Sequence, residues 1–237
     1  MKSYYIIPGI VALTALGAQA ASIGVNFGAG RSSLAVADSA GVVAQQNWNN
    51  ASGKSGNIGA LVDDTGAASG AAVVWQSDEE WSDGSPVEPN GKLLKGWIAE
   101  QATPGSPSTI DVTSIPYAQY DLYFYLSHDR SFEDVRLTEA NGAFPQFDAV
   151  ENNPNLSNPV VWTEQTTSAT TAGNYVHFRG LTATDLSITL GAVDVNYNGG
   201  GSNDRNAING LQIVEVPEPS ALLLGLAGLL FIRRRRA

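Results

Sequence analysis

Short apolar runs, separated by clusters of Gly, Asn, Asp, Ser and Pro, fill residues 21–216, and helical periodicity is almost absent there. The stretch STIDVTSI is typical, because Ile110 and Val112 alternate with Asp111 and Thr113. Such alternation places successive side chains on opposite faces of a strand. We expect further strands in SIGVNFG, GAAVVW, LLKGWI, YDLYFYLSHD, NYVHFRGL, DLSITLGAVDVNY and NAINGLQIVEV. This pattern predicts an all-β chain.

Two of these stretches indicate how the strands are arranged. In YDLYFYLSHD, one face carries Leu122, Phe124 and Leu126, and the other carries Asp121, Tyr123 and Tyr125. NAINGLQIVEV is apolar on both faces around Leu211 and Ile213, as a strand in the middle of a sheet would be. Ten or more short strands with turn-rich connections favour a two-sheet β-sandwich or jelly roll over residues 21–214, with an up-and-down barrel as the lesser alternative.

The first residues, MKSYYIIPGIVALTALGAQA, have the build of a secretory signal peptide. Lys2 precedes an apolar run that continues to Ala18, and Ala18 and Ala20 form a small-x-small cleavage pattern. We therefore expect residues 1–20 to form a signal helix that is removed by cleavage before Ala21. Export of this kind requires the Sec machinery and a signal peptidase as partners.

Charge and cysteine content narrow the function classes. Residues 21–216 hold eight basic and 22 acidic side chains, a net charge of −14, and the chain has no cysteine. A domain this acidic repels phosphate backbones, so a nucleic-acid partner is not expected. Without cysteine and with only two histidines, a zinc site has no ligand set and no disulfide supports the fold. The domain must be stabilised by its own core.

The chain ends in VPEPSALLLGLAGLLFIRRRRA. As a helix, Ala221–Ile232 would span about 18 Å at 1.5 Å per residue, against a hydrocarbon core of about 30 Å. Arg233, Arg234, Arg235 and Arg236 would stay on the cytoplasmic side of a membrane. We interpret residues 215–237 as a sorting segment that is held briefly in the inner membrane and then cut.

This segment resembles the PEP-CTERM protein-sorting signal, in which a Pro-Glu-Pro motif precedes a short apolar helix and an arginine cluster. Here the motif is Pro217, Glu218 and Pro219. The resemblance implies an exopolysaccharide-producing Gram-negative bacterium whose exosortase reads the signal and cuts near the motif. The mature protein would then be secreted to the cell surface or extracellular matrix.

The body of the chain carries a second resemblance. VNFG, QNWNN and the closing AINGLQIVEVPEP are similar to β-sandwich ectodomains that accompany such signals, some of them galactose-binding-like jelly rolls. A non-catalytic surface or matrix protein is therefore the leading expectation. The alternative is a module that binds extracellular polysaccharide through Trp48, Trp81, Tyr123 and Tyr125, because exposed aromatic rings stack on sugars.

One loop raises the question of a metal. DVNYNGGGSNDR begins like a calcium loop, but Arg205 stands where an EF-hand needs a bidentate glutamate. An EF-hand is excluded on this ground. A calcium site of another kind, with Asp194, Asn203 and Asp204 as ligands, stays open as a hypothesis, and no other cofactor is expected.

Catalytic signals are weak. In DEEWSD, Glu79 and Glu80 lie beside a tryptophan, as the paired carboxylates of a glycoside hydrolase could, but a polar loop would not separate their pKa values. His128 and His177 have no partner in the sequence that would complete a Ser-His-Asp triad. We expect no enzymatic activity, with a secreted glycan-active enzyme as the remote alternative.

Overall fold

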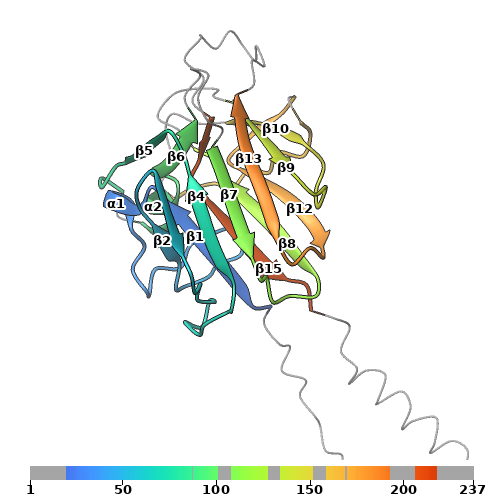
Figure 1. Cartoon of the computed structure of the whole chain (residues 1–237). Coiled ribbons are helices and arrows are strands. Elements are labelled where there is room, and N and C mark those ends of the chain that lie inside the picture. The colour runs from blue at the N-terminus through green and yellow to red at the C-terminus, as the bar shows by residue number, and fades with distance from the viewer. Residues whose placement is uncertain are drawn as a thin grey trace, which may run out of the picture.

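The computed structural model describes residues 20–86, 88–100, 108–127, 134–151, 159–168, 170–192 and 206–217. Strands and two very short helices make up its regular structure (Figure 1). The elements are β1 (Ser22–Phe27), α1 (Ala29–Ser32), β2 (Asn49–Ala51), β3 (Ser55–Ile58), β4 (Ala72–Gln76), β5 (Glu79–Ser82), α2 (Pro89–Leu93), β6 (Gly96–Glu100), β7 (Ser108–Thr113), β8 (Tyr120–Tyr125), β9 (Asp134–Glu139), β10 (Phe147–Glu151), β11 (Ala172–Gly173), β12 (Tyr175–Leu181), β13 (Leu186–Ala192), β14 (Asn206–Ile208) and β15 (Gly210–Glu215). The all-β prediction is confirmed.

The strands of the described residues form three sheets. The back sheet has the order β12-β8-β15-β1-β2, and the front sheet has the order β11-β10-β9-β13-β7-β4-β3. The side sheet is smaller, with the order β14-β6-β5. Neighbouring strands are antiparallel except for the pairs β1–β2 and β10–β11, which are parallel. Most neighbours in the two large sheets are distant in sequence, so the chain crosses repeatedly between the sheets.

One hydrophobic core lies between the front and back sheets. Its members alternate along the strands of both sheets and include Ile23, Val25, Leu122, Phe124, Leu211 and Ile213 from the back sheet, and Val73, Ile110, Val112, Leu137, Ile188 and Leu190 from the front sheet. Two sheets that share one core in this way are consistent with the expected β-sandwich.

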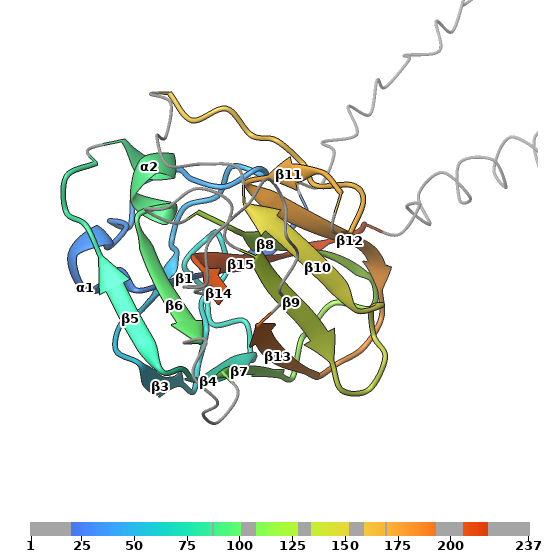
Figure 2. The ribbon, with the colours of Figure 1, turned by 90° about the horizontal axis from the view of Figure 1, so that it is seen from above.

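The outer face of the back sheet is also covered. Residues 33–48, α2 and the segment around Trp162 lie over it and form a second hydrophobic cluster with Tyr123 and Tyr125 of β8. Figure 2 shows α2 on the opposite side of the back sheet from β4 and β7. As a result, β8 is buried on both faces from Leu122 onward.

Several strand predictions can be compared with the structure. Strands form where STIDVTSI and NYVHFRGL predict them, as β7 and β12, and the described part of DLSITLGAVDVNY forms β13. The expected central strand, β15, lies in the middle of the back sheet with Gly210–Val214 buried throughout. The prediction of a single strand in LLKGWI was wrong, because Leu93 ends α2 and β6 begins only at Gly96. The expected signal helix and C-terminal helix lie outside the described residues.

Candidate functional site

Three of the four aromatic residues proposed for sugar binding are buried. Trp48, Tyr123 and Tyr125 are 5%, 7% and 0% exposed, so the expectation that they offer exposed rings was wrong. The reason is the second cluster, in which Trp48 packs edge-on against Tyr125 with ring centroids 5.9 Å apart. Burial raises the pKa of Tyr123 to about 12. These rings support the back sheet and cannot stack on a ligand.

Trp81 is the fourth aromatic residue and the one that reaches the surface. It lies on β5 directly opposite Trp97 of β6, and it is 38% exposed whereas Trp97 is 2% exposed. The two rings stack with their centroids 6.0 Å apart and an angle of 24° between their planes. The buried Trp97 ring therefore holds Trp81 in one orientation, which suits a rigid apolar platform.

The acidic residues around Trp81 lie partly on a strand, where a loop was expected. Glu79 and Glu80 belong to β5. The Glu80 carboxylate accepts a hydrogen bond of 2.8 Å from the backbone N–H of Gly53. Hydrogen bonds from the Ser85 hydroxyl and backbone lower the pKa of Asp83. Glu80 and Asp83 thus stabilise turns. The lowered pKa of Asp83 is the opposite of what an acid catalyst requires.

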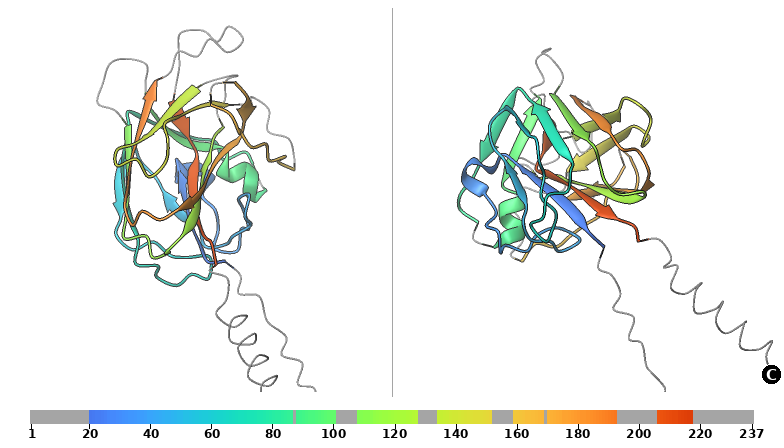
Figure 3. Two further views of the ribbon diagram at one scale, coloured as in Figure 1. Left: turned by 90° about the vertical axis from the view of Figure 1, so that its right-hand side faces the viewer. Right: turned by 60° about the horizontal axis from the view of Figure 1, so that its bottom comes forward.

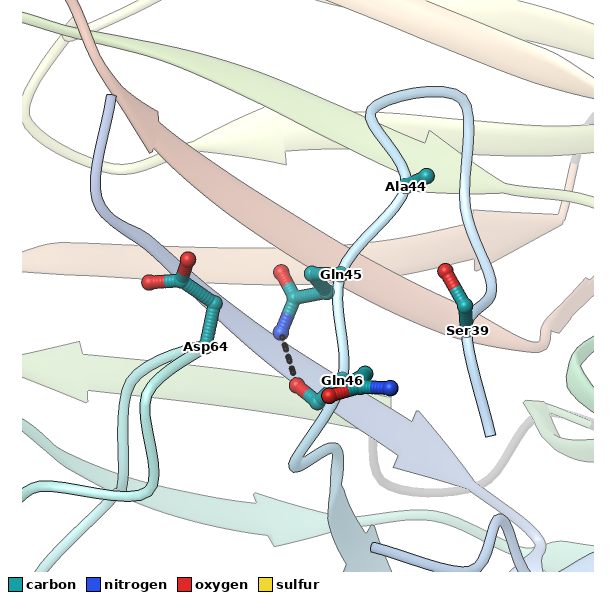
Figure 4. A pocket seen from close by; sticks show the side chains of 5 residues that line it. All are labelled: Ser39, Ala44, Gln45, Gln46 and Asp64. Carbon is teal, nitrogen blue, oxygen red and sulfur yellow. Dashed lines mark hydrogen bonds between the residues drawn. The ribbon is translucent and has the colours of Figure 1, made fainter. Parts of the chain in front are cut away.

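A polar hollow of about 220 Å³ lies at a different place on the surface. Its lining consists of Ser39, Ala44, Gln45, Gln46 and Asp64 (Figure 4). The first four come from one loop, and Asp64 lies on a neighbouring loop, as Figure 4 shows. Amide, hydroxyl and carboxylate groups of this kind can hydrogen-bond a polyol. The sequence did not single out this hollow, because it forms only when two loops meet.

A buried hydrogen-bond network lies beneath the hollow and fixes its loop to the back sheet. Gln212 of β15, which is fully buried, accepts a bond of 2.6 Å from the Tyr125 hydroxyl. Its amide nitrogen donates to the backbone oxygen of Val43 and to the side-chain oxygen of Gln45, each at 2.7 Å. The Tyr125 hydroxyl in turn accepts from the backbone N–H of Val42. Every polar atom of the Gln212 side chain is therefore used.

His177 forms a pair that sequence reasoning missed. Its Nε2 lies 2.9 Å from Asp121 Oδ2 on the adjacent strand, and its ring stacks on Tyr123 with centroids 4.0 Å apart. Burial lowers the pKa of His177, only partly offset by its hydrogen bond with Asp121. The neutral form is therefore favoured near pH 7. The register of β8 against β12 creates this pair, and spacing in the sequence gave no sign of it.

The two ends of the described chain lie side by side. Ser22 pairs with Val214 in the ladder between β1 and β15. The backbone N–H of Glu215 donates to the Ala21 carbonyl at 2.8 Å, and Pro217 follows as an exposed residue. Figure 3 shows the start of β1 and the end of β15 at the same end of the molecule.

Other predicted site residues lie outside the described ranges. They are Ala18 of the cleavage pattern, Glu218 and Pro219 of the sorting motif, Arg233, Arg234, Arg235 and Arg236, His128, and the calcium candidates Asp194, Asn203 and Asp204. Of the cleavage pattern, Ala20 and Ala21 are described and both are partly buried.

Within the described ranges, no three His, Cys, Asp or Glu side chains gather closely enough to hold a metal ion. In that same part of the chain, no helix is both long and apolar enough to cross a membrane. No protein-family model matches the chain, and no curated protein or solved structure is significantly similar to it.

Proposed function

We propose that this chain is the precursor of a non-catalytic protein of a bacterial cell surface or extracellular matrix. Residues 1–20 direct export and are removed before Ala21. Residues 215–237 form a PEP-CTERM signal that holds the precursor in the inner membrane until an exosortase cuts near Pro217. The domain between these segments is the mature product.

The pairing of β1 with β15 is the observation that carries this proposal. Every buried member of the main core lies between Ile23 and Ile213. Within the described ranges, the two proposed signals contact the domain at its edge, through Ala20, Glu215 and Val216. Because both ends of the domain lie together, the two apolar segments of the precursor can enter the same face of one bilayer. A domain that closes on itself in this way tolerates the loss of both tails.

The strand order supports a jelly roll as the fold of this domain. If β1, β7, β8, β9, β10, β12, β13 and β15 are numbered one to eight, the back sheet reads 1-8-3-6 and the front sheet reads 2-7-4-5. Double-sheet jelly rolls are built from eight antiparallel strands in two Greek keys, and many of them are lectin domains. In this proposal, β4 extends the front sheet beyond the eight strands.

Changing the arginine cluster tests the sorting proposal. Replacing Arg233–Arg236 with glutamine removes the positive charge that keeps this end in the cytoplasm. We expect the precursor to be mislocalised, with several-fold less mature protein at the surface, as measured by cell fractionation and immunoblotting. Replacing the same residues with lysine keeps the charge and is the matched control for orientation. Normal surface yield of the glutamine variant would contradict the proposal.

Polysaccharide binding by the same domain is a second candidate, favoured by the exposed and rigid ring of Trp81. Trp81→Ala removes the ring, and we expect it to weaken binding to the exopolysaccharide of the native host more than about tenfold in calorimetry or affinity electrophoresis. Val74→Ala is the control, because Val74 is 51% exposed on the outer face of the front sheet. Equal binding by both variants would remove this candidate.

A further inference from the structure

We infer that the domain contains a preformed binding site for the α-ammonium group that cleavage creates at Ala21, and that Glu215 is the counter-ion of this group. This inference rests on the proposed removal of residues 1–20. In that step water hydrolyses the Ala20–Ala21 peptide bond, which leaves a carboxylate on Ala20 and an amine on Ala21. The amine takes up a proton near neutral pH, so a neutral amide becomes a cation at this position.

The geometry is already in place in the uncut chain. The backbone nitrogen of Ala21 lies 3.4 Å from Glu215 Oε2, and it donates a hydrogen bond to that oxygen. The Ala21 carbonyl accepts from the Glu215 backbone N–H, so the two residues are joined twice. After cleavage, the donor carries a positive charge, so its hydrogen bond to the Glu215 carboxylate also becomes an ion pair.

The surroundings favour a cation at this point. The next residue, Ser22, donates its backbone N–H to Asp64 Oδ1 at 3.2 Å, so a second carboxylate lies one residue along the chain from the Ala21 nitrogen. Burial, together with the negative charges of Asp63, Asp64 and Glu215, raises the pKa of the Tyr117 phenol. No lysine, arginine or histidine side chain in the described ranges pairs with Glu215. The α-ammonium group would supply the missing partner.

The consequence is an ion pair at the end of β15, directly before the C-terminal signal. Glu215 is the last residue of β15 and stands two positions before Pro217. An ion pair between Ala21 and Glu215 would close the end of the β1–β15 ladder, where strands otherwise fray. Cleavage at the N-terminus would therefore stabilise the strand from which the sorting motif emerges.

A double-mutant cycle tests the pair. Two purified chains are compared, one beginning at Ala21 and one at Ala20, both ending at Pro217, each with and without Glu215→Gln. The extra alanine moves the ammonium group one residue away from Glu215. Any effect of Ala20 on packing is the same with and without Glu215→Gln, so it cancels in the cycle. We expect Glu215→Gln to lower Tm by about 1 to 3 °C more in the Ala21 chain than in the Ala20 chain. We expect this difference to shrink in 1 M NaCl, because salt screens exposed ion pairs.

The outcomes separate this inference from the proposed function. Equal losses of Tm in the two chains would overturn the ion pair while leaving the proposed processing untouched. If the difference between the two Tm losses did not change with salt, the ion pair would also be overturned, because such a difference would come from packing and not from charge. A native protein that did not begin at Ala21 would overturn both the proposed cleavage and the proposed ammonium-binding site.

Discussion

Replacing Gly96 with alanine is expected to destabilise the domain by about 3 kcal/mol or more, which is severe for a single methyl group. A Cβ on Gly96 would overlap the backbone oxygen of Gly28 and the hydroxyl of Ser32. Gly28 has a φ of +62°, and a Cβ there would meet the backbones of Gly96, Trp97 and Trp81. The two glycines therefore mark a contact of backbone against backbone, which no side-chain rotation can relieve.

Urea unfolding followed by circular dichroism measures this effect, and Gly59→Ala is the matched control. A Cβ on Gly59 has no atom within 4 Å, so this variant should stay within about 0.5 kcal/mol of the parent chain. If Gly96→Ala were as stable as Gly59→Ala, the described contact between the side sheet and the turn after β1 would be contradicted. The position of Trp81 would be contradicted as well, because Trp81 lies in the same sheet.

Gln212→Leu is expected to cost about 3 kcal/mol, although leucine is apolar and close to glutamine in size. Gln212 is fully buried and makes three hydrogen bonds, with Tyr125, Val43 and Gln45. Leucine would leave the partners of these bonds unsatisfied, and each buried unsatisfied group costs about 1 to 3 kcal/mol. The loop that lines the hollow should loosen at the same time.

Gln76→Leu is the matched control, because Gln76 lies exposed on β4 and the same change there removes no buried bond. We expect it to change the free energy of unfolding by less than about 0.5 kcal/mol. Hydrogen exchange of the amides of Val42 and Gln45 provides a second readout, and it should accelerate in Gln212→Leu alone. Equal stability of the two leucine variants would show that the buried network does not hold the loop.

The sequence was most informative where one face of a strand meets the core. Ile110 and Val112 in β7, and Leu186, Ile188 and Leu190 in β13, alternate with polar residues and all point into the core. Period-two alternation is a local property, so it can be recognised without knowing the partner strand. The central position of β15 followed in the same way from its two apolar faces.

The sequence was least informative where burial depends on distant segments. Tyr123 and Tyr125 alternate with apolar residues and were therefore expected to face solvent, but residues 33–48 cover them. The start of α2 was visible in principle, because Pro89 follows Glu88, whose side chain accepts a hydrogen bond from the Asn90 N–H. A helix of five residues has little stability of its own and depends on tertiary packing, so the sequence pattern alone favoured a strand there.

The candidate site shows the same division. Trp81 was named from the sequence, but only its pairing with Trp97 makes it a rigid exposed ring. The hollow beside Gln45 and the contact between Ala21 and Glu215 join segments that lie far apart along the chain. Contacts of this kind depend on register and crossovers between sheets, which no local pattern encodes.

The central claim is that the two apolar terminal segments are discarded from a domain that folds without them. Intact mass spectrometry of the protein from its own bacterium tests this most directly, because one measurement defines both ends. We expect a chain that begins at Ala21, ends near Pro217 and lacks Arg233–Arg236, with any attached group visible as added mass. A mature protein that still carries the four arginines would contradict the account.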